Sequence, residues 1–440
     1  MKKFPLVFIA LAFFGFSAEA APGMREINDT EIETVVEKLI QPIARAAKIP
    51  DRRLRVHIIA DNDLNAFVSS GEDIYIYAGT IMKLENPNAF QAVVAHELGH
   101  IIGGHYTNMM SRVEKELVAA IIMQSLGIAL LAINPEAGAG VMMGAPGITQ
   151  SNLMAFSRDE ERLADMTGLG LLKSAGLPRG GFIEMMEIMH GQNVYIENAK
   201  NHSQISHPTT AERLMNGRQW ILKNGGDGGE LPKDLVREYQ MARAKLIGYL
   251  QSEKSVQDLY PSKNSVAAKY ARAISDLRRS KLKTALKTAQ ELSKADKSNP
   301  YFFELAGDIY MQTGKYSDAI ESYEKSLSLL EDESMQISAA LALALVERNE
   351  KDDAAEATRK AKRALILAGP SAKHNPFLYF ILARAYASQN MQGLSDWATA
   401  EYNWSLGKKK EAKKFAERAK KVLPADSAEY KKSEDILRKE

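Results

Sequence analysis

The alternation of hydrophobic and polar positions divides the chain into a mixed first half and a helical second half. Apolar residues in 32–47 recur at helical spacing, and the helix that they predict ends before Pro50. Residues 55–60 and 73–79 are short stretches rich in β-branched and aromatic residues, and they predict two strands. A long helical pattern follows the Asn-Pro-Asn sequence at 86–88. The first half therefore predicts an α+β domain that is mostly helical with a small sheet.

A glycine-rich stretch marks the end of this mixed region. The sequence NGGDGGELP at residues 224–232 places four glycines before a proline, which neither a helix nor a strand accommodates. We interpret it as a linker between a domain at 21–223 and a second domain at 233–440. Everything after the linker has a helical pattern.

The second domain contains an internal repeat. Residues 299–329 place Gly307, Ala319 and Tyr323 where a tetratricopeptide unit has its small and aromatic signature residues. Ala285 lies one repeat period of 34 residues before Ala319. We predict about four degenerate repeats in an all-α tetratricopeptide solenoid. The alternative is an ordinary helical bundle whose alanines match by coincidence.

Composition limits the function classes. The chain has 440 residues, of which 45% are hydrophobic and 25% charged, as in folded globular proteins. The formal net charge is +2, so no strong basic patch of the kind that nucleic-acid binding needs is expected. The chain has no cysteine, which excludes disulfides, thiol chemistry and thiolate metal sites.

Two apolar segments bear on localisation. Residues 1–20 combine two lysines, a short apolar run and an A-x-A site, which predicts a cleaved secretory signal peptide; a membrane anchor is the alternative. Residues 117–133 are apolar but just under the length of a spanning helix. We interpret 117–147 as a hairpin that forms a lid, a contact with a membrane surface, or core.

The sequence AVVAHELGHIIGGHY, residues 92–106, carries the chemistry. His96 and His100 lie four apart, so on a helix both imidazoles project from one face and can bind one metal ion. Glu97 lies beside them and can act on a water molecule as a general base. Apolar residues surround the pair, and buried imidazoles on such a helix need a partner. A metal ion is the simplest one.

A catalytic zinc site normally has three protein ligands. The stretch 157–176 supplies Glu161 and Asp165, four apart on one helical face. We expect Glu161 to bind the metal and Asp165 to orient a ligand histidine from behind. Asp159 and Glu160 are rival ligands, and a charged helix start without a metal role is the alternative.

Three ordered motifs carry a family resemblance. HELGHxxxxH at 96–105, SRxxExxAD at 157–165 and SHPTTAERL at 206–214 resemble zinc metallopeptidases of the HtpX and CAAX-prenyl-endopeptidase type. With the signal peptide and the repeats, the chain resembles the periplasmic β-barrel assembly-enhancing proteases of Gram-negative bacteria. The resemblance implies a gluzincin fold with one zinc ion per chain, endopeptidase activity, and a chaperone-like quality-control role toward misfolded or stalled outer-membrane proteins. The repeats would then bind the outer-membrane assembly machinery.

The resemblance also assigns His207 and Arg213. Arg213 would stabilise the oxyanion of the tetrahedral intermediate, and His207 would assist there or act as a transient extra zinc ligand that keeps the enzyme latent. A helix cap before Pro208 is the alternative role of His207. His105 is expected to be structural. The remaining histidines match no motif: His57, His190, His202 and His374.

The strand at 73–78 lies shortly before the zinc helix, where metallopeptidases commonly present an edge that pairs with an extended substrate; an interior strand is the alternative. The sequence thus favours a periplasmic zinc endopeptidase acting on unfolded outer-membrane proteins. Two other functions remain open: a latent or non-proteolytic repeat-based chaperone, and a metalloprotease anchored in the inner membrane.

Overall fold

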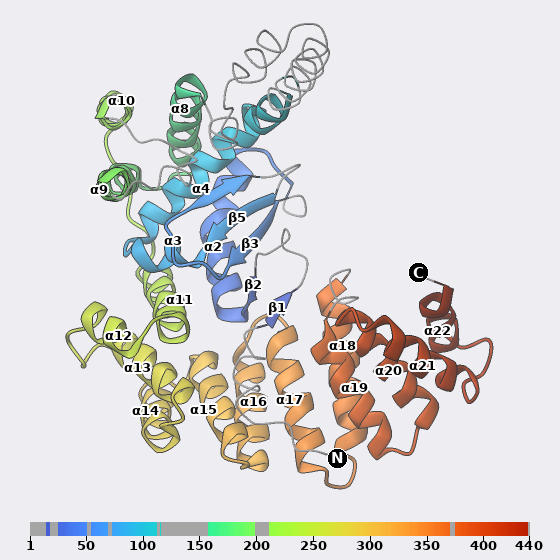
Figure 1. Ribbon diagram of the computed structural model, residues 1–440. Coiled ribbons are helices and arrows are strands. Elements are labelled where there is room, and N and C mark those ends of the chain that lie inside the picture. The colour runs from blue at the N-terminus through green and yellow to red at the C-terminus, as the bar shows by residue number, and fades with distance from the viewer. Residues whose placement is uncertain are drawn as a thin grey trace, which may run out of the picture. The chain divides into compact units, whose positions relative to one another are not determined.

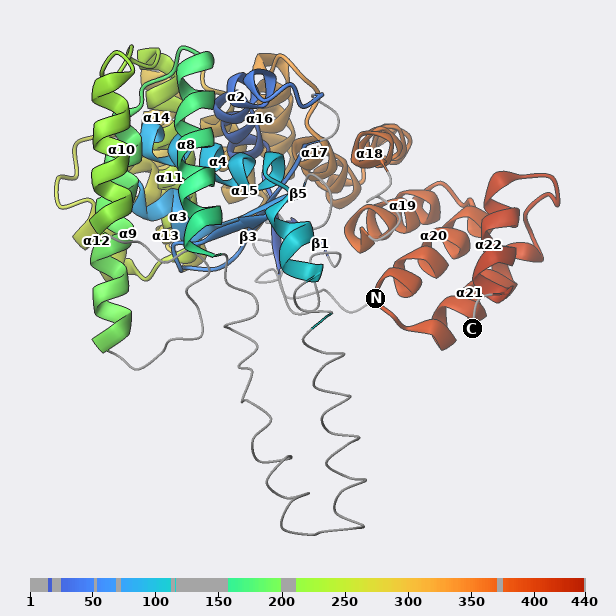
Figure 2. The same cartoon turned by 90° about the horizontal axis from the view of Figure 1, so that it is seen from above.

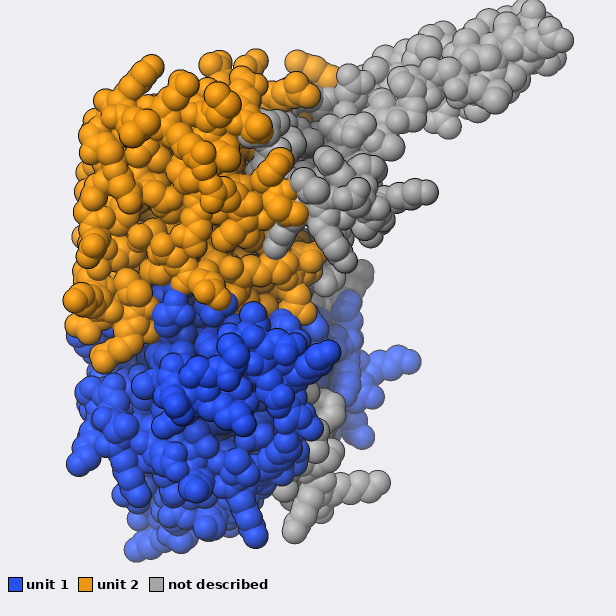
Figure 3. Space-filling view, turned by 90° about the vertical axis from the view of Figure 1, so that its left-hand side faces the viewer, with its two compact units in different colours: residues 1–35, 238–440 blue, residues 36–237 orange. Residues whose placement is uncertain are grey.

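A computed structural model gives the architecture, and Figure 1 shows the order of its elements. It describes residues 15–17, 25–50, 54–68, 73–111, 115, 157–198, 211–369 and 375–438. The chain forms two compact units, coloured separately in Figure 3: unit 1 comprises Met1–Val35 and Glu238–Glu440, and unit 2 comprises Val36–Arg237. Their boundaries fall inside two helices, α2 (Thr30–Ala46) and α11 (Lys233–Leu250).

Unit 2 contributes three short strands to a sheet: β3 (Arg55–Ile59), β4 (Ala66–Val68) and β5 (Asp73–Tyr77). β5 lies in the middle, parallel to β3 with Ile58 opposite Ile76, and antiparallel to β4. From Ile74 to Tyr77 buried and partly buried residues alternate, which is the two-residue period of a sheet with one face on the core. The two strands predicted at 55–60 and 73–79 are confirmed as β3 and β5, whereas β4 was not predicted. The expectation that 73–78 form an edge is wrong, because β5 is paired on both sides.

Besides its parts of α2 and α11, the described part of unit 2 contains α3 (Ala78–Lys83), α4 (Pro87–Ile102), α8 (Arg158–Ser174), α9 (Gly180–Asn198) and α10 (Ala211–Lys223). Residues 105–111 are also helical. α4 packs against both α8 and α9, and α10 packs against α8 and α9 (Figures 1 and 2). α4 is buried along nearly its whole length, so it forms the centre of this unit.

Local sequence explains where the two central helices begin. The Asn86 side chain accepts a hydrogen bond from the Asn88 backbone amide, and Pro87 occupies the first helical position of α4, where its missing amide hydrogen costs nothing. Ser157 and Glu160 form a reciprocal capping box at the start of α8. Three acidic residues in the first turn of α8 match the positive end of the helix dipole.

Unit 1 consists mainly of paired helices. They run from α12 (Glu253–Leu259) through α13 (Val266–Arg278), α14 (Leu282–Ala295), α15 (Pro300–Gln312), α16 (Tyr316–Leu329), α17 (Met335–Arg348), α18 (Asp353–Ala368), α19 (Pro376–Ser388), α20 (Gln392–Ser405) and α21 (Lys409–Lys420) to α22 (Ala428–Arg438). Successive helices pack against one another in chain order. Strands β1 (Gly15–Ser17) and β2 (Glu26–Asn28) pair antiparallel in the same unit.

Small residues allow the paired helices to approach closely. Ala285, Ala319 and Ala412 are fully buried on α14, α16 and α21. A Cβ atom at Gly307 would lie 2.5 Å from the Tyr323 ring, so the contact between α15 and α16 needs glycine there. The all-helical prediction for the second half is confirmed.

The glycine-rich segment lies between α10 and α11 and is irregular. The Arg179 side chain donates to the Gly226 carbonyl at 2.8 Å, which fastens this segment to the start of α9. By their contacts residues 25–35 group with unit 1, and the domain bounds 21–223 and 233–440 stay a prediction. Among the described residues no helix is long and apolar enough to cross a membrane. Most of the 1–20 segment and all of 117–147 lie outside the described residues, so those interpretations stay predictions.

Candidate metal and catalytic site

α4 and α8 bring the predicted ligands together. The Nε2 atoms of His96 and His100 lie 3.1 Å apart. The Glu161 carboxylate approaches both rings, with one oxygen 3.5 Å from His96 Nε2 and the other 3.4 Å from His100 Nε2. The three residues are buried, at 5%, 0% and 0% exposure. Among the residues that the structure describes, they are the one group of three or more metal-binding side chains whose donor atoms all lie within 4.8 Å.

This donor set fits a zinc ion. Two imidazole nitrogens and one carboxylate are the ligands of His₂Glu catalytic zinc sites. A tetrahedral ion with ligands at about 2.0–2.1 Å holds neighbouring ligand atoms roughly 3.3–3.4 Å apart. The distances among the three side chains, from 3.1 to 3.5 Å, agree with that spacing. His96, His100 and Glu161 are therefore suited to hold zinc through these atoms.

The far side of the His96 ring is held by a buried ion-pair network. His96 Nδ1 lies 2.9 Å from Asp165 Oδ1. Arg213 on α10 binds Asp165 through two hydrogen bonds of 2.7 Å, and its Nη1 lies 2.6 Å from Glu161 Oε2. One guanidinium group thus holds both the ligand carboxylate and the carboxylate that orients the ligand ring. Asp165 has the position predicted for it behind His96.

The network determines the charge of its members. Burial alone raises the pKa of Asp165, but hydrogen bonds from Arg213 and His96 outweigh it, so the pKa lies below its usual range. Burial alone lowers the pKa of Arg213, and its two carboxylate partners more than reverse this, so the pKa rises. Asp165 therefore stays ionised and Arg213 stays charged. An ionised Asp165 accepts the proton on His96 Nδ1, so that Nε2 presents its lone pair to a metal.

His105 has a comparable place behind the second histidine. Its Nδ1 lies 3.0 Å from His100 Nδ1, and its side chain is buried at 2% exposure. A His100 ring that binds a metal through Nε2 carries its proton on Nδ1 and donates it to His105. His105 was expected to be structural only. The structure adds that it contacts the ring of a ligand.

Two glycines explain how the helices come close enough. A Cβ atom at Gly99 would lie 2.5 Å from the Ala164 carbonyl oxygen, and one at Gly168 would lie 2.9 Å from the Ala95 backbone. α4 and α8 therefore meet backbone to backbone beside the ligands. The sequence analysis did not use these positions. The glycine within HELGH and the one three residues after Asp165 were the available signal.

The other predicted residues fall into three groups. Glu97 is buried at 2% exposure next to His96, as a general base at this site requires. Asp159 points to solvent with 92% of its side chain exposed, and Glu160 caps its own helix, so neither rival replaces Glu161. His207 lies outside the described residues, as do His202 and His374, so its role stays a prediction.

Two further histidines lie apart from this group. His57 on β3 contacts Asp73 at 3.0 Å and stacks on Tyr75 of β5. His190 is exposed on α9. Neither belongs to the donor group of α4 and α8. Their interpretation as ordinary histidines agrees with these positions.

Comparison with known sequences agrees with the chemistry of the donor set. Residues 26–221 match the profile described as Peptidase family M48. This part of the chain is an M48 zinc metallopeptidase domain. It contains both ligand-bearing helices as well as Asp165 and Arg213.

The chain also resembles several curated proteins. It is 23% identical over 323 residues to the β-barrel assembly-enhancing protease of Escherichia coli K12, covering 71% of this chain and 65% of that protein. It is 28% identical over 164 residues to the metalloprotease YcaL of the same organism, covering 36% and 59%. The mitochondrial metalloendopeptidase OMA1 of Schizosaccharomyces pombe is 23% identical over 186 residues, covering 42% and 52%. The chain thus spans just under two thirds of the length of the first of these relatives.

Proposed function

We propose that the chain is a periplasmic zinc endopeptidase that cleaves unfolded or misassembled outer-membrane proteins and has a chaperone-like quality-control role. The observation that carries the proposal is the buried group of His96, His100 and Glu161, with Asp165 and Arg213 behind it, in an M48 peptidase domain. Such a group is costly to bury without a function, because buried charges need partners and correct geometry. Here the partners leave the donor atoms directed at one point.

The residues divide the chemistry among them. When bound, zinc lowers the pKa of water toward neutrality and polarises a carbonyl group. Glu97 takes the proton from the attacking water and returns it to the leaving amine. Asp165 holds the His96 ring, and Arg213 holds Asp165 and Glu161. We infer that Arg213 acts as a positioning residue here, in addition to the oxyanion role expected from the sequence.

An extended substrate would pair with β4. Among the described strands, β4 is paired with β5 alone, and it contacts α4, the helix that carries the histidines. Pairing along a strand edge uses the substrate backbone and depends weakly on its sequence. An unfolded segment meets this requirement, whereas a folded protein does not. This assignment replaces β5, which is interior.

The helical pairs of unit 1 are proposed to be tetratricopeptide repeats that bind partner proteins. The buried alanines that recur from Ala285 to Ala319, and the close approach at Gly307, support this. A relative's name, β-barrel assembly-enhancing protease, supports outer-membrane proteins and their assembly machinery as partners. Export through a cleaved signal peptide and a membrane-surface contact through 117–147 belong to the same proposal.

The first experiment measures zinc content and proteolysis together. The purified chain is incubated with an unfolded outer-membrane β-barrel protein, with and without chelator, and compared with Glu97→Gln. We expect one zinc ion per chain in both, and cleavage only in the unmodified protein without chelator. Asp159→Asn is the matched control, because this acidic side chain on α8 is exposed. Bound zinc without cleavage would favour a latent enzyme or a chaperone, and absence of zinc would refute the proposal.

A further inference from the structure

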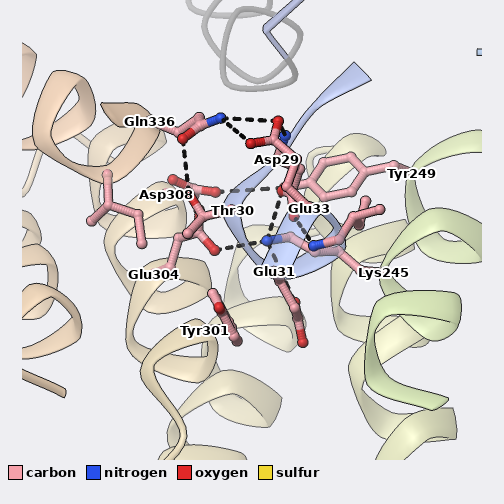
Figure 4. A network of polar contacts seen from close by, with 12 residues as sticks. Asp29, Thr30, Glu31, Glu33, Lys245, Tyr249, Tyr301, Glu304, Asp308 and Gln336 are labelled. Carbon is pink, nitrogen blue, oxygen red and sulfur yellow. Dashed lines mark hydrogen bonds and ion pairs between the residues drawn. The ribbon is translucent and has the colours of Figure 1, made fainter. Parts of the chain in front are cut away.

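The start of α2 is buried in unit 1 and bonded to helices more than 200 residues away in the sequence. Asp29 Oδ2 lies 2.8 Å from Lys245 Nζ on α11, and Tyr270 on α13 donates a hydrogen bond of 2.8 Å to Glu31 Oε2. Figure 4 shows Asp29, Glu31 and Lys245 converging in one network. Asp29, Glu31 and Lys245 are exposed at only 5%, 1% and 3%. Both acidic residues are thus almost fully buried, with partners on α11 and α13.

The hydroxyl between the two acids is also bound. Thr30 Oγ1 lies 2.6 Å from Ser334 Oγ and donates a hydrogen bond of 2.8 Å to Gln336 Oε1. Gln336 in turn donates to Glu33 at 3.3 Å. Ser334 and Gln336 form the start of α17. Three consecutive side chains at the start of α2 therefore each have a separate partner in unit 1.

The segment is bound as a helix start and not merely as an acidic strand. Asp29 uses its Oδ1 atom to cap its own helix, accepting from the Ile32 amide at 3.1 Å. Its backbone amide donates to Glu33 Oε1 at 2.9 Å. The other Asp29 oxygen remains for Lys245. The pocket thus accepts an Asp-Thr-Glu sequence in the conformation of a first helical turn.

The residues of this network are spread over several helices of unit 1. Tyr270, Glu304 and Gln336 lie on α13, α15 and α17, the first helices of three successive pairs. Lys245 lies on α11, before the first pair. Helical-repeat arrays bind extended ligands along such continuous surfaces. The start of α2 occupies the place of such a ligand.

The charged groups around the α2 start allow this segment to dissociate. Lys245 Nζ lies 2.7 Å from Glu304 Oε2, so the cation keeps a carboxylate partner when the α2 start is absent. Burial raises the pKa of Glu31 to about 8, opposed by Lys245 and by the Tyr270 hydrogen bond and reinforced by Asp29 and Glu304. Glu31 is therefore bound as a neutral acid below that pH, and its ionisation weakens the complex.

We propose that the pocket lined by Lys245, Tyr270, Ser334 and Gln336 is a binding site for an acidic helix start of a partner protein, which residues 29–34 of the same chain occupy as an internal ligand. A partner segment of Asp-Thr-Glu type binds by displacing residues 29–34. This deepens the proposed partner-binding role of unit 1 and rests on it. It does not require proteolysis.

The test uses the full chain carrying Glu97→Gln, so that binding is measured without cleavage. The probe is a fluorescent peptide of residues 25–46. We expect Asp29→Asn with Thr30→Val in the chain to raise the affinity for the peptide at least tenfold, because the internal ligand loses its ion pair with Lys245 and its hydroxyl contact with Ser334. Adding Lys245→Met should abolish this gain. Lys287→Met, which changes an exposed lysine on α14, is the matched control and should leave the gain in affinity unchanged.

A second variant keeps the proposal testable if the first is unstable. The chain has no cysteine, and the Thr30 and Ser334 hydroxyl oxygens lie 2.6 Å apart, so Thr30→Cys with Ser334→Cys can form a single disulfide. We expect the reduced chain to bind the peptide at least tenfold more tightly than the oxidised chain, in which the disulfide holds residues 29–34 in place. Equal binding by the two forms, or no binding by any chain, would overturn the proposal. Because neither readout involves peptide hydrolysis, such a failure is distinct from failure of the proposed peptidase.

Discussion

Arg213 offers the sharpest test of the site because its guanidinium group neutralises two buried carboxylates at once. Arg213→Met removes the charge and the hydrogen bonds while keeping a long apolar side chain. Asp165 and Glu161, each with 1% of its side chain exposed, then lose the cation that holds them at 2.6–2.7 Å. Removing one partner of a buried ion pair costs about 3–5 kcal/mol. For a unit of this size that corresponds to a decrease in Tm of roughly 6–20 °C.

Metal loading separates this explanation from a simple packing defect. Zinc would bring positive charge beside Glu161, so we expect Arg213→Met to destabilise the chelator-treated protein more than the zinc-loaded protein. Calorimetric unfolding in both states measures the difference. Arg218→Met is the matched control on the same helix, because Arg218 pairs with Glu187 and both side chains are 53% exposed. Exposed pairs contribute about 0–1 kcal/mol.

Kinetics distinguish the two roles considered for Arg213. A positioning role predicts weaker zinc binding in Arg213→Met, with partial recovery in Arg213→Lys, which keeps the charge but not the planar fork. A role limited to the oxyanion predicts unchanged zinc affinity and a lower kcat. If Arg213→Met unfolds within about 2 °C of the unmodified protein in both metal states, the reasoning from the buried ion pair is refuted.

Three further predictions concern other contacts. His105→Ala should weaken zinc binding about 10–100-fold by releasing the His100 ring, whereas His105→Gln, whose amide oxygen still accepts a hydrogen bond, should retain most of the affinity; equal losses in a zinc titration would contradict this. Gly99→Ala should destabilise unit 2 by about 1–3 kcal/mol and weaken zinc binding, with Gly170→Ala, which meets no atom within 4 Å, as its control in denaturant unfolding. The pKa of Glu31 is raised to about 8 in the folded chain, so its contribution to the free energy of unfolding is complete below its ordinary pKa and is lost as the pH rises to 8. We expect a decrease on the order of 1–4 kcal/mol over this range, which Glu31→Gln should reduce. A Glu31→Gln chain whose stability depends on pH as in the unmodified chain would contradict this prediction.

Much of the site was predictable because its residues lie in short local patterns. His96 and His100 are one turn apart on a helix, as are Glu161 and Asp165, and helical geometry alone places each pair on one face. Glu161 was expected as the third ligand with Asp159 and Glu160 as rivals, and only the tertiary structure shows that Glu161 is the one that approaches both histidine rings. Nothing local indicated that His105 contacts the His100 ring, because the helix is interrupted at Gly103 and Gly104 and the contact depends on how the chain turns there.

The sequence by itself determined the helical second half, the strands at β3 and β5, and the placement of His96 with His100 and of Glu161 with Asp165 on single helical faces, because these depend on periodicities of two and of 3.6 residues. Tertiary structure decided which side chains meet across elements. The interior position of β5, the hold of Arg213 on two carboxylates, and the burial of Asp29 and Glu31 beside Lys245 all join segments far apart in the sequence. Such contacts form only when helices and strands pack, since the free energy that selects them comes from burial of both partners together.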